Sequence, residues 1–382
     1  MALDPQAQEV INLVIKSGRP AYNTLSPKDA RQLFRETRPA STPTPAEIGA
    51  VKNLTADGPG GPIPLRVYRP ADVPAGTPLP VLVYYHGGGW VIGDLDTHDV
   101  QCRQITAEAG VTVVAVDYRL APEHKFPAAV DDAWAATRWV VAHAGELGID
   151  GRRVAVAGDS AGGNLAAVVA LMARDAGGPA IALQVLIYPV TDVAAESKSY
   201  RDFADGYMLT RDGMRWFTNH YLKAAGEAQD WRVSPLRAPS LAGLPPALVI
   251  TAGFDPLRDE GLAYVRRLRH AGVPVDLLHY PGQIHGFMSF DRVLVGARDA
   301  LARTGSLLEQ AFRDDLHGSS VEEIAIPWPR AWESMPWLHL GQRWRETRVA
   351  CMVARDQVGR RGVLEGIAKR WPRVSGGSPP AD

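Results

Sequence analysis

Short apolar runs alternate with longer amphipathic segments along most of this chain. The apolar runs have the length of buried strands and lie at about 62–69, 80–86, 111–116, 153–157, 182–188, 246–251 and 274–280. The segments between them have the spacing of helices, at about 97–109, 127–144, 161–175, 257–271 and 286–312. Strands that alternate with helices form a mostly parallel central sheet flanked by helices on both faces. The pattern therefore predicts an α/β fold.

Two segments lie outside this alternation. Residues 8–16 are amphipathic, with Val10, Leu13 and Val14 at helical spacing. Residues 196–224 are rich in aromatic side chains and fall between the strand that ends near Tyr188 and the strand that begins at Ala247. A connection in that place leaves a parallel sheet at its carboxyl edge, where open α/β folds bind ligands. The two segments either cover such a site or are ordinary surface helices.

The last part of the chain, 313–382, has a different character. It holds five of the ten tryptophans, its hydrophobic periodicity is poor, and it ends in a run of Ser, Gly and Pro. It contains no strand run that could complete the sheet. We expect a weakly structured or disordered extension after residue 312.

Composition narrows the function classes. The chain has 382 residues, 46% hydrophobic residues and a formal net charge of −1, which gives no electrostatic reason to expect nucleic acid or an anionic membrane as partner. Its two cysteines are far apart, and no Cys/His cluster has zinc spacing, so we expect neither a disulfide framework nor a metal or other cofactor. No apolar stretch approaches the ~20 residues of a membrane span, and no signal sequence is recognisable. We expect a cytoplasmic protein, and the sequence leaves open whether it is a homodimer.

A candidate nucleophile, Ser160, lies in the sequence GDSAG at 158–162, directly after the apolar run 154–157 and before a helix-forming run. The pattern G-x-S-x-G at a strand-to-helix junction places the serine oxygen at the tip of a strained turn. Its glycines allow strand and helix backbones to pass too closely for a Cβ. A Gly-rich turn with a serine N-cap is the simpler alternative, but the flanking strand and helix favour the nucleophile.

A second motif, HGGGW at 86–90, follows the predicted strand at 80–86. Consecutive glycines expose backbone N–H groups that can stabilise a developing oxyanion, and the residue after the nucleophile, Ala161, usually supplies another. Glycine runs also bind phosphates, but neither the Walker spacing nor a G-x-G-x-x-G at a strand–helix junction is present. We therefore do not expect a dinucleotide site.

The acid and base of a catalytic triad should follow the serine in that order. Asp255 comes just after the strand at 246–251, and His285 just after the strand at 274–280, so both reach the carboxyl edge of the sheet. His285 would accept the serine proton, and Asp255 would hold the imidazole in the required tautomer.

Other acids and histidines compete for these roles. Asp259 and Glu260 are rival carboxylates, but they lie one helical turn further on, where we expect them on a helix. His279 lies within a strand and His270 near a helix end, so neither fits the position of the base as well as His285.

With these motifs in their order, the chain resembles the hormone-sensitive-lipase-type esterases of the α/β-hydrolase superfamily, in the bacterial branch with a GDSAGG elbow. The matching segments are HGGGW at 86–90, YRLAPE at 118–123, GDSAGGN at 158–164, DPLRD at 255–259 and HGF at 285–287. The resemblance covers roughly residues 1–312. One departure is Gln283, where relatives more often carry an apolar residue, and we expect it to adjust the loop before His285.

The resemblance implies a catalytic domain over 1–312 with a helical cap from about 1–45 and 196–230. It implies Ser160 as nucleophile, Asp255 as acid and His285 as base, with an oxyanion hole formed by the N–H groups of Gly88, Gly89 and Ala161. Large side chains of the cap and the strand ends suit an acyl or alcohol pocket. We expect the substrate to contact Trp90, Tyr188, Phe203, Tyr207, Trp216 and Phe217.

The function that follows is a serine carboxylesterase that hydrolyses small-molecule esters of short to medium chain length through an acyl-enzyme intermediate. An amidase or deacetylase would use the same triad, and the residues do not separate the two. A non-catalytic receptor on a hydrolase scaffold, like the plant gibberellin receptors, is a third hypothesis. Such receptors lack the catalytic histidine, whereas His285 is present here.

Overall fold

A nine-stranded sheet forms the centre of the protein in the computed structural model, which describes residues 2–74, 76–313 and 320–324. The strands are β1 (Ala50–Ala56), β2 (Ile63–Arg69), β3 (Leu79–Tyr85), β4 (Thr112–Val116), β5 (Ile149–Asp159), β6 (Leu183–Ile187), β7 (Ala247–Phe254), β8 (Val275–Ile284) and β9 (Val321–Glu323). Their order in the sheet is β1-β2-β4-β3-β5-β6-β7-β8-β9. The pairs β1–β2 and β2–β4 are antiparallel and the others parallel, as the sequence predicted for most of the sheet.

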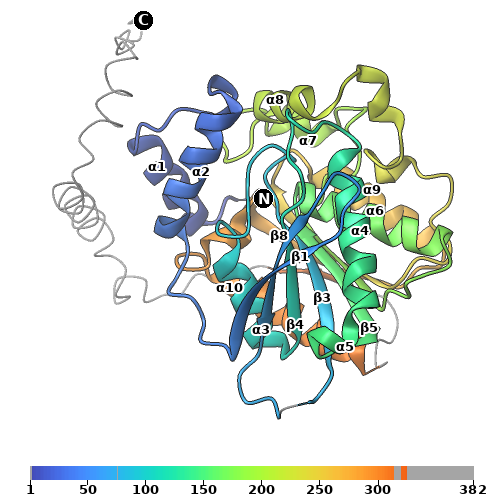
Figure 1. The fold of residues 1–382 in the computed structure, drawn as a ribbon. Helices are drawn as coiled ribbons and strands as arrows, with labels where there is room; N and C mark the ends of the chain where they lie inside the picture. Colours follow the sequence, from blue (N-terminus) through green and yellow to red (C-terminus); the bar gives the residue numbers. More distant parts are fainter. Residues whose placement is uncertain (1, 75, 314–319, 325–382) are drawn as a thin grey trace, which may run out of the picture. The chain divides into compact units, whose positions relative to one another are not determined.

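Helices cover both faces of this sheet (Figure 1). They are α3 (Asp99–Ala109), α4 (Ala128–Ala142), α5 (Ala144–Leu147), α6 (Ala161–Asp175), α9 (Arg258–His270) and α10 (Val295–Phe312). Alternate side chains of β3 enter two separate hydrophobic cores. Val83 packs with the core that includes α4 and α6, and Leu82 with the core that includes α3 and α10. This two-sided burial explains why the central strands are apolar at most positions and why their sequence signal was strong.

Further helices lie at the carboxyl ends of the parallel strands (Figure 1). They are α1 (Pro5–Lys16), η1 (Tyr22–Thr24) and α2 (Pro27–Ser41) from the N-terminal segment, and α7 (Lys198–Asp202) and α8 (Arg211–Tyr221) from the connection between β6 and β7. Sequence chemistry sets the start of α2, because Pro27 occupies its first turn and the Ser26 hydroxyl accepts the Asp29 N–H. The helices of the N-terminal segment and those between β6 and β7 are in contact, since α8 packs against η1.

Three features differ from the sequence prediction. Strand β1 was not anticipated, because most of its residues are exposed and it lacks an apolar run. The single helix predicted at 286–312 is divided into η4 (Phe287–Phe290) and α10, because the first turn after His285 buries Phe287 and Met288 as a 3-10 turn.

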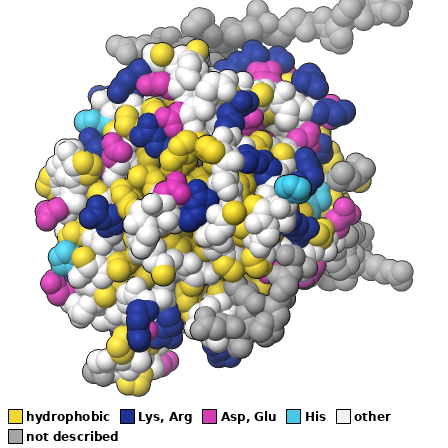
Figure 2. Space-filling view, turned by 90° about the vertical axis from the view of Figure 1, so that its right-hand side faces the viewer, with side chains coloured by type: hydrophobic (Ala, Val, Ile, Leu, Met, Phe, Trp, Pro, Cys, Tyr) yellow, Lys and Arg dark blue, Asp and Glu magenta, His cyan; other side chains and the backbone are white. Residues whose placement is uncertain are grey.

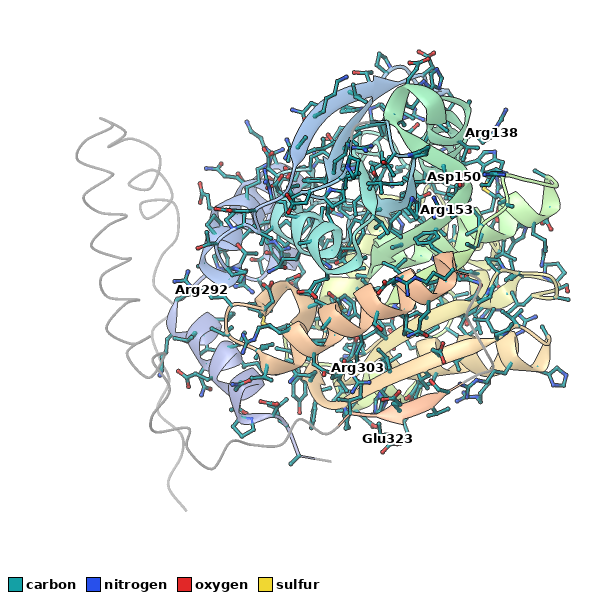
Figure 3. The ribbon with its side chains drawn as sticks, turned by 90° about the horizontal axis from the view of Figure 1, so that it is seen from below. Arg138, Asp150, Arg153, Arg292, Arg303 and Glu323 are labelled. Carbon is teal, nitrogen blue, oxygen red and sulfur yellow. The ribbon has the colours of Figure 1, made fainter. Side chains whose placement is uncertain are left out.

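The third difference corrects the expectation that no strand follows residue 313. Strand β9 pairs in parallel with β8, although its three side chains are exposed and give no hydrophobic signal. The Asp276 carboxylate accepts from the N–H and hydroxyl of Ser320, at 3.0 and 2.7 Å. Arg303 of α10 bonds Glu322 at 2.7 Å, and Figure 3 shows Arg303 and Glu323 on these adjoining elements. The rest of 313–382, apart from Arg313 and 320–324, lies outside the described residues.

Among the described residues, none of the helices combines the length and apolar character needed to cross a bilayer.

Candidate active site

Ser160 occupies a sharp turn between β5 and α6. Its backbone has φ 57° and ψ −115°, a left-handed conformation that a residue with a Cβ rarely adopts. The turn is held because the Ser160 N–H donates to the carbonyl of Ile187 at 2.8 Å. Gly162 is required by close approach, since a Cβ there would lie 1.9 Å from the carbonyl oxygen of Tyr85. The G-x-S-x-G pattern thus forms the strand–turn–helix geometry that the sequence predicted.

Three side chains from separate strand ends meet at this turn. His285 Nε2 lies 3.0 Å from Ser160 Oγ, and His285 Nδ1 lies 2.8 Å from Asp255 Oδ2. The second oxygen of Asp255 accepts the N–H of Leu257 at 2.8 Å, so the buried carboxylate is held on both sides. The structure therefore brings Ser160, His285 and Asp255 into one hydrogen-bonded chain.

The rival acids have other partners. The Asp259 carboxylate accepts the N–H of Ser199 at 2.9 Å. Glu260 is buried and accepts the N–H of Thr191 at 2.7 Å, and burial raises its pKa well above the usual range. Both residues lie in the first turn of α9, as the sequence analysis expected.

The rival histidines are also placed elsewhere. His279 lies within β8 and hydrogen-bonds Thr251 at 2.9 Å, and His270 ends α9 with an exposed side chain. No group of three His, Cys, Asp or Glu side chains in the described ranges is arranged to hold a metal ion.

The glycine loop after β3 lies beside the nucleophile turn. Gly88 and Gly89 have φ of 119° and 58°, and a Cβ on Gly88 would lie 2.1 Å from the carbonyl oxygen of Ile92. The Gly88 carbonyl accepts the N–H groups of Val91 and Ile92 at 3.1 and 3.0 Å, which closes the loop on itself. Ala161 is the first residue of α6, where helix N–H groups have no partner within the helix. This arrangement gives a loop whose N–H groups can face an oxyanion.

Asp159 links the nucleophile turn to this loop, a role that sequence reasoning missed. Its buried carboxylate accepts the N–H of Gly87 at 2.9 Å and the hydroxyl of Tyr84 at 2.8 Å, and His98 Nε2 lies 3.4 Å away. Burial alone would raise the pKa of Asp159, but the charge of His98 and the bonds from His98 and Tyr84 outweigh it and hold that pKa far below its usual range. The available signal was the acidic residue inside the G-x-S-x-G motif.

The predicted pocket residues divide into two groups. Tyr188 has φ 35° and its ring centre lies 4.8 Å from that of His285. Phe217 of α8 covers the glycine loop, because a Cβ on Gly89 would lie 2.3 Å from its ring. Trp90, in contrast, has no exposed surface and stacks on Tyr221 at 4.2 Å, so its ring packs in the core instead of lining an open cleft.

The remaining aromatic residues are half-buried, and two of them lie near the end of β7. Phe203 and Tyr207 have ring centres 5.5 Å apart, and both rings contact Phe254, the residue before Asp255. Trp216 packs on Phe217 with ring centres 5.1 Å apart. Tyr188 thus packs on the base and Phe217 on the glycine loop, while Phe203 and Tyr207 pack on the residue before Asp255.

Gln283, the departure from the family pattern, is buried beside the loop of the base. Its amide nitrogen donates to the Asp4 carboxylate at 3.1 Å, and the Asp4 N–H donates to the Gly282 carbonyl at 2.9 Å. The polar side chain therefore attaches the start of α1 to the strand that ends just before His285.

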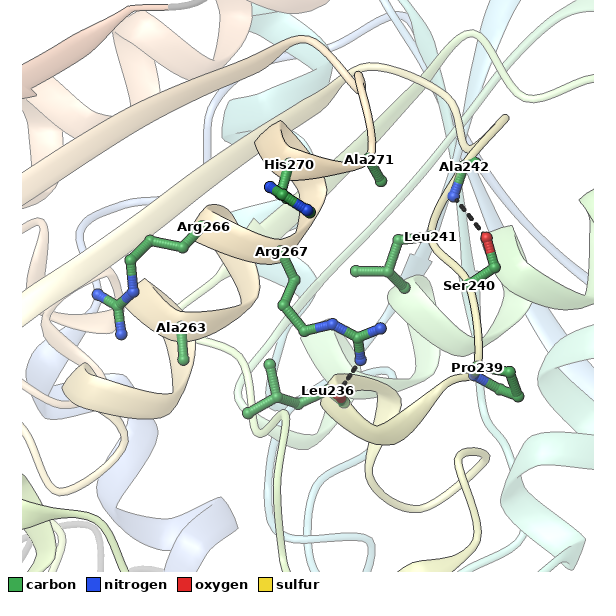
Figure 4. A pocket seen from close by; sticks show the side chains of 10 residues that line it. All are labelled: Leu236, Pro239, Ser240, Leu241, Ala242, Ala263, Arg266, Arg267, His270 and Ala271. Carbon is green, nitrogen blue, oxygen red and sulfur yellow. Dashed lines mark hydrogen bonds between the residues drawn. The ribbon is translucent and has the colours of Figure 1, made fainter.

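A hollow lies between α9 and the segment 236–242, and none of its lining residues belongs to the triad (Figure 4). Its lining is mostly apolar, and the Arg267 guanidinium at its edge donates to the backbone carbonyls of Leu236 and Ala238. On the face shown in Figure 2, positive and negative side chains are interspersed with apolar ones, without a continuous region of one sign.

The comparisons with known proteins agree with this geometry. The profile of the alpha/beta hydrolase fold family matches residues 82–289. The carboxylic ester hydrolase LipN of Mycobacterium tuberculosis is 51% identical over 245 residues, which cover 63% of this chain and 64% of LipN. The match thus spans slightly less than two thirds of that relative. The ethyl acetate hydrolase of Pseudomonas putida is 38% identical over 321 residues, 81% of this chain and 99% of that protein.

A solved structure shows the same architecture. The ester hydrolase EH1AB1 from the metagenome of Lake Arreo, complexed with a derivative of bipyridine phosphonate, superposes with a TM-score of 0.79. It is 43% identical in sequence and covers 81% of this chain and 99% of its own. The chain therefore belongs to the α/β-hydrolase fold family, in its hormone-sensitive-lipase-type branch.

Proposed function

We propose that the protein is a serine carboxylesterase that hydrolyses small-molecule esters through an acyl-enzyme. The observation that carries this proposal is the hydrogen-bonded chain from Ser160 Oγ through His285 to Asp255, at 3.0 and 2.8 Å, on a strained turn beside the glycine loop. The names of the relatives, which are ester hydrolases, support the same reaction class.

The residues divide the reaction between them. His285 Nε2 accepts the hydroxyl proton as Ser160 Oγ forms a bond to the ester carbonyl carbon. The negative charge on the carbonyl oxygen is stabilised by the N–H groups of Gly88, Gly89 and Ala161. His285 then donates its proton to the departing alcohol, which breaks the ester bond and leaves an acyl group on Ser160.

Water completes the cycle. His285 accepts a proton from a water molecule, whose oxygen attacks the acyl carbonyl, and then returns that proton to Ser160 Oγ as the carboxylic acid leaves. Asp255 holds the Nδ1–H of His285 throughout and stabilises the imidazolium. All atoms and charges balance without a further reactant.

The substrate is an ester with a short to medium acyl chain. We assign the cap to residues 1–45 and 196–230, whose half-buried and buried aromatic side chains pack on one another. We expect this packing to leave limited room above the triad. Phe217 and Tyr188 bound the space next to the glycine loop and the base. A pocket filled in this way favours small acyl groups, since each extra methylene must displace a packed side chain.

An amide substrate remains the second candidate, because one acyl-enzyme chemistry serves both bonds. The geometry gives no preference, whereas the names of the relatives favour esters. A receptor without activity is disfavoured, because His285 is present and bonded to both partners.

The test is a series of p-nitrophenyl esters with acyl chains from two to sixteen carbons, with p-nitroacetanilide as the amide. We expect kcat/KM to be highest at short to medium length and far lower for the anilide. A preference for the anilide would favour the amidase, and a preference for the longest chains would contradict a small acyl pocket bounded by Phe217 and Tyr188.

A further inference from the structure

Arg31 of α2 reaches from the N-terminal segment to the glycine loop and to a second chain segment at Ala121. Its Nε donates to the carbonyl of Val91 at 2.7 Å, and its Nη2 donates to the carbonyl of Ala121 at 2.8 Å. The N–H of Ala121 in turn donates to the carbonyl of Trp90 at 2.9 Å. One planar guanidinium thus joins Val91, two residues after Gly89, to the segment at Ala121, which itself bonds the glycine loop.

Arg38, two helical turns further along α2, holds the far end of the same loop. Its Nε donates to the carbonyl of Thr97 at 2.7 Å, and its side chain is buried. The Thr97 hydroxyl bonds His98 Nδ1 at 3.0 Å, and His98 faces Asp159, whose carboxylate accepts the Gly87 N–H. A continuous set of bonds therefore runs from α2 to the first glycine of the loop.

The glycine loop needs such support. Gly88, Gly89 and Trp90 all have positive φ, and for Trp90, with φ 60°, this conformation costs free energy. A loop of this kind keeps its N–H groups aligned only if the surroundings determine its shape. Misplacement by about 1 Å can cost about 100-fold in rate.

We propose that Arg31 is a positioning residue, which holds the glycine loop in the shape that directs the N–H groups of Gly88 and Gly89 at the oxyanion, while the Arg38 bonds support the far end of the loop. This inference rests on the proposed function. It makes α2 part of the machinery that stabilises the transition state, in addition to any role as a cover for the pocket.

Glu123 pairs with Arg31, and a substitution of Glu123 tests the effect of this ion pair independently of the bonds from Arg31 to the backbone carbonyls. The Arg31 guanidinium bonds both carboxylate oxygens of Glu123, at 2.8 and 2.6 Å, and holds the pKa of Glu123 down to about 2. The Glu123 side chain is 54% exposed, so this surface pair contributes little stability. Glu123→Gln weakens the pair but leaves the bonds from Arg31 to the carbonyls of Val91 and Ala121.

The test compares Arg31→Ala, Arg31→Lys and Glu123→Gln with the natural protein, using p-nitrophenyl butyrate. We expect both arginine variants to lower kcat and kcat/KM together, by roughly 10- to 100-fold, because the lost alignment acts in the transition state. KM should stay within about threefold, and the inhibition constant of a trifluoromethyl ketone, which forms a tetrahedral oxyanion on the serine, should rise by the same factor as kcat/KM falls. Glu123→Gln should stay within about twofold of the natural protein.

A second readout does not depend on activity. Hydrogen exchange of the amides in 87–92 should accelerate in Arg31→Lys, which keeps the charge and should fold, but not in Glu123→Gln. Full kcat in Arg31→Lys with unchanged exchange would overturn the inference, and so would equal losses in Arg31→Lys and Glu123→Gln. Absence of ester hydrolysis by the natural protein would instead refute the proposed function, while the exchange measurement would still decide whether Arg31 holds the loop.

Discussion

At the scale of single residues, Asp255 and Asp259 are four positions apart but face different partners. Asp255→Asn should lower kcat/KM by roughly 10⁴, because an amide at this position favours the wrong tautomer of His285. Asp259→Asn should retain most activity, since its carboxylate caps the N–H of Ser199. Steady-state kinetics of the two variants decides the assignment, and a severe loss at Asp259 with a mild loss at Asp255 would reverse it.

Asp117 gives a prediction about stability and pH. Burial and the nearby charge of Asp94 raise the pKa of Asp117 to about 6, against 3.8 for the free side chain. Between about pH 4 and 6 the folded protein therefore binds more protons than the unfolded chain, so this residue lowers the free energy of unfolding as the pH rises. In Asp117→Asn the side chain at this position cannot ionise, so it does not lower the free energy of unfolding as the pH rises.

The measurement is the melting temperature of Asp117→Asn and the natural protein from pH 4 to pH 8. Near pH 4 the two melting temperatures should be equal. From there to about pH 6 the melting temperature of the variant should rise relative to that of the natural protein, and above pH 6 the difference should stay constant. Asp57→Asn, at an exposed aspartate, controls for the change in net charge. An advantage that is already complete at pH 4, or that shrinks with rising pH, would contradict the assigned direction.

At the scale of elements, strands and helices that bury apolar side chains on both sheet faces were predictable, because their pattern is local. β1 and β9 were not, since their side chains are exposed and the neighbouring strand holds them by backbone bonds. The nucleophile turn and the glycine loop were also predictable, because glycine at fixed spacing reflects local backbone geometry.

Contacts between distant segments could not be predicted in this way. Trp90 was expected in the pocket, but its ring is fully buried and stacks on Tyr221 of α8. Arg31 bonds carbonyls 60 and 90 positions away, and no local pattern indicates such partners.

The contact between α8 and the glycine loop gives an element-scale prediction. Gly89→Ala adds a methyl group about where the Phe217 ring lies, and Gly88→Ala adds one against the backbone of Ile92. Both should lower kcat by roughly 10² to 10³ through lost donor alignment. Adding Phe217→Leu should recover part of the loss for Gly89→Ala but not for Gly88→Ala, because a backbone obstacle remains. Equal recovery in both double variants would contradict the contact.

At the scale of the whole molecule, the position of the last sheet strand can be tested by truncation. A chain that ends after Ile324 keeps β9 and should retain its melting temperature and kcat/KM. A chain that ends after Phe312 loses the bonds from Ser320 to Asp276 and from Glu322 to Arg303, and it opens the edge of β8. Each lost bond contributes about 1 kcal/mol, so we expect a melting temperature lower by roughly 5 °C and more aggregation through the open edge. Equal stability of both truncated chains would show that β9 adds nothing.

The central claim is that Ser160 is the nucleophile of an ester hydrolase, and covalent labelling tests it most directly. A fluorophosphonate should add one phosphonyl group per chain, map to the peptide that contains Ser160, and abolish ester hydrolysis in proportion to labelling. Ser160→Ala should keep the fold, remain unlabelled and lose roughly 10⁶ in turnover. A natural protein that stays unlabelled, or a Ser160→Ala variant that still hydrolyses esters, would contradict the account.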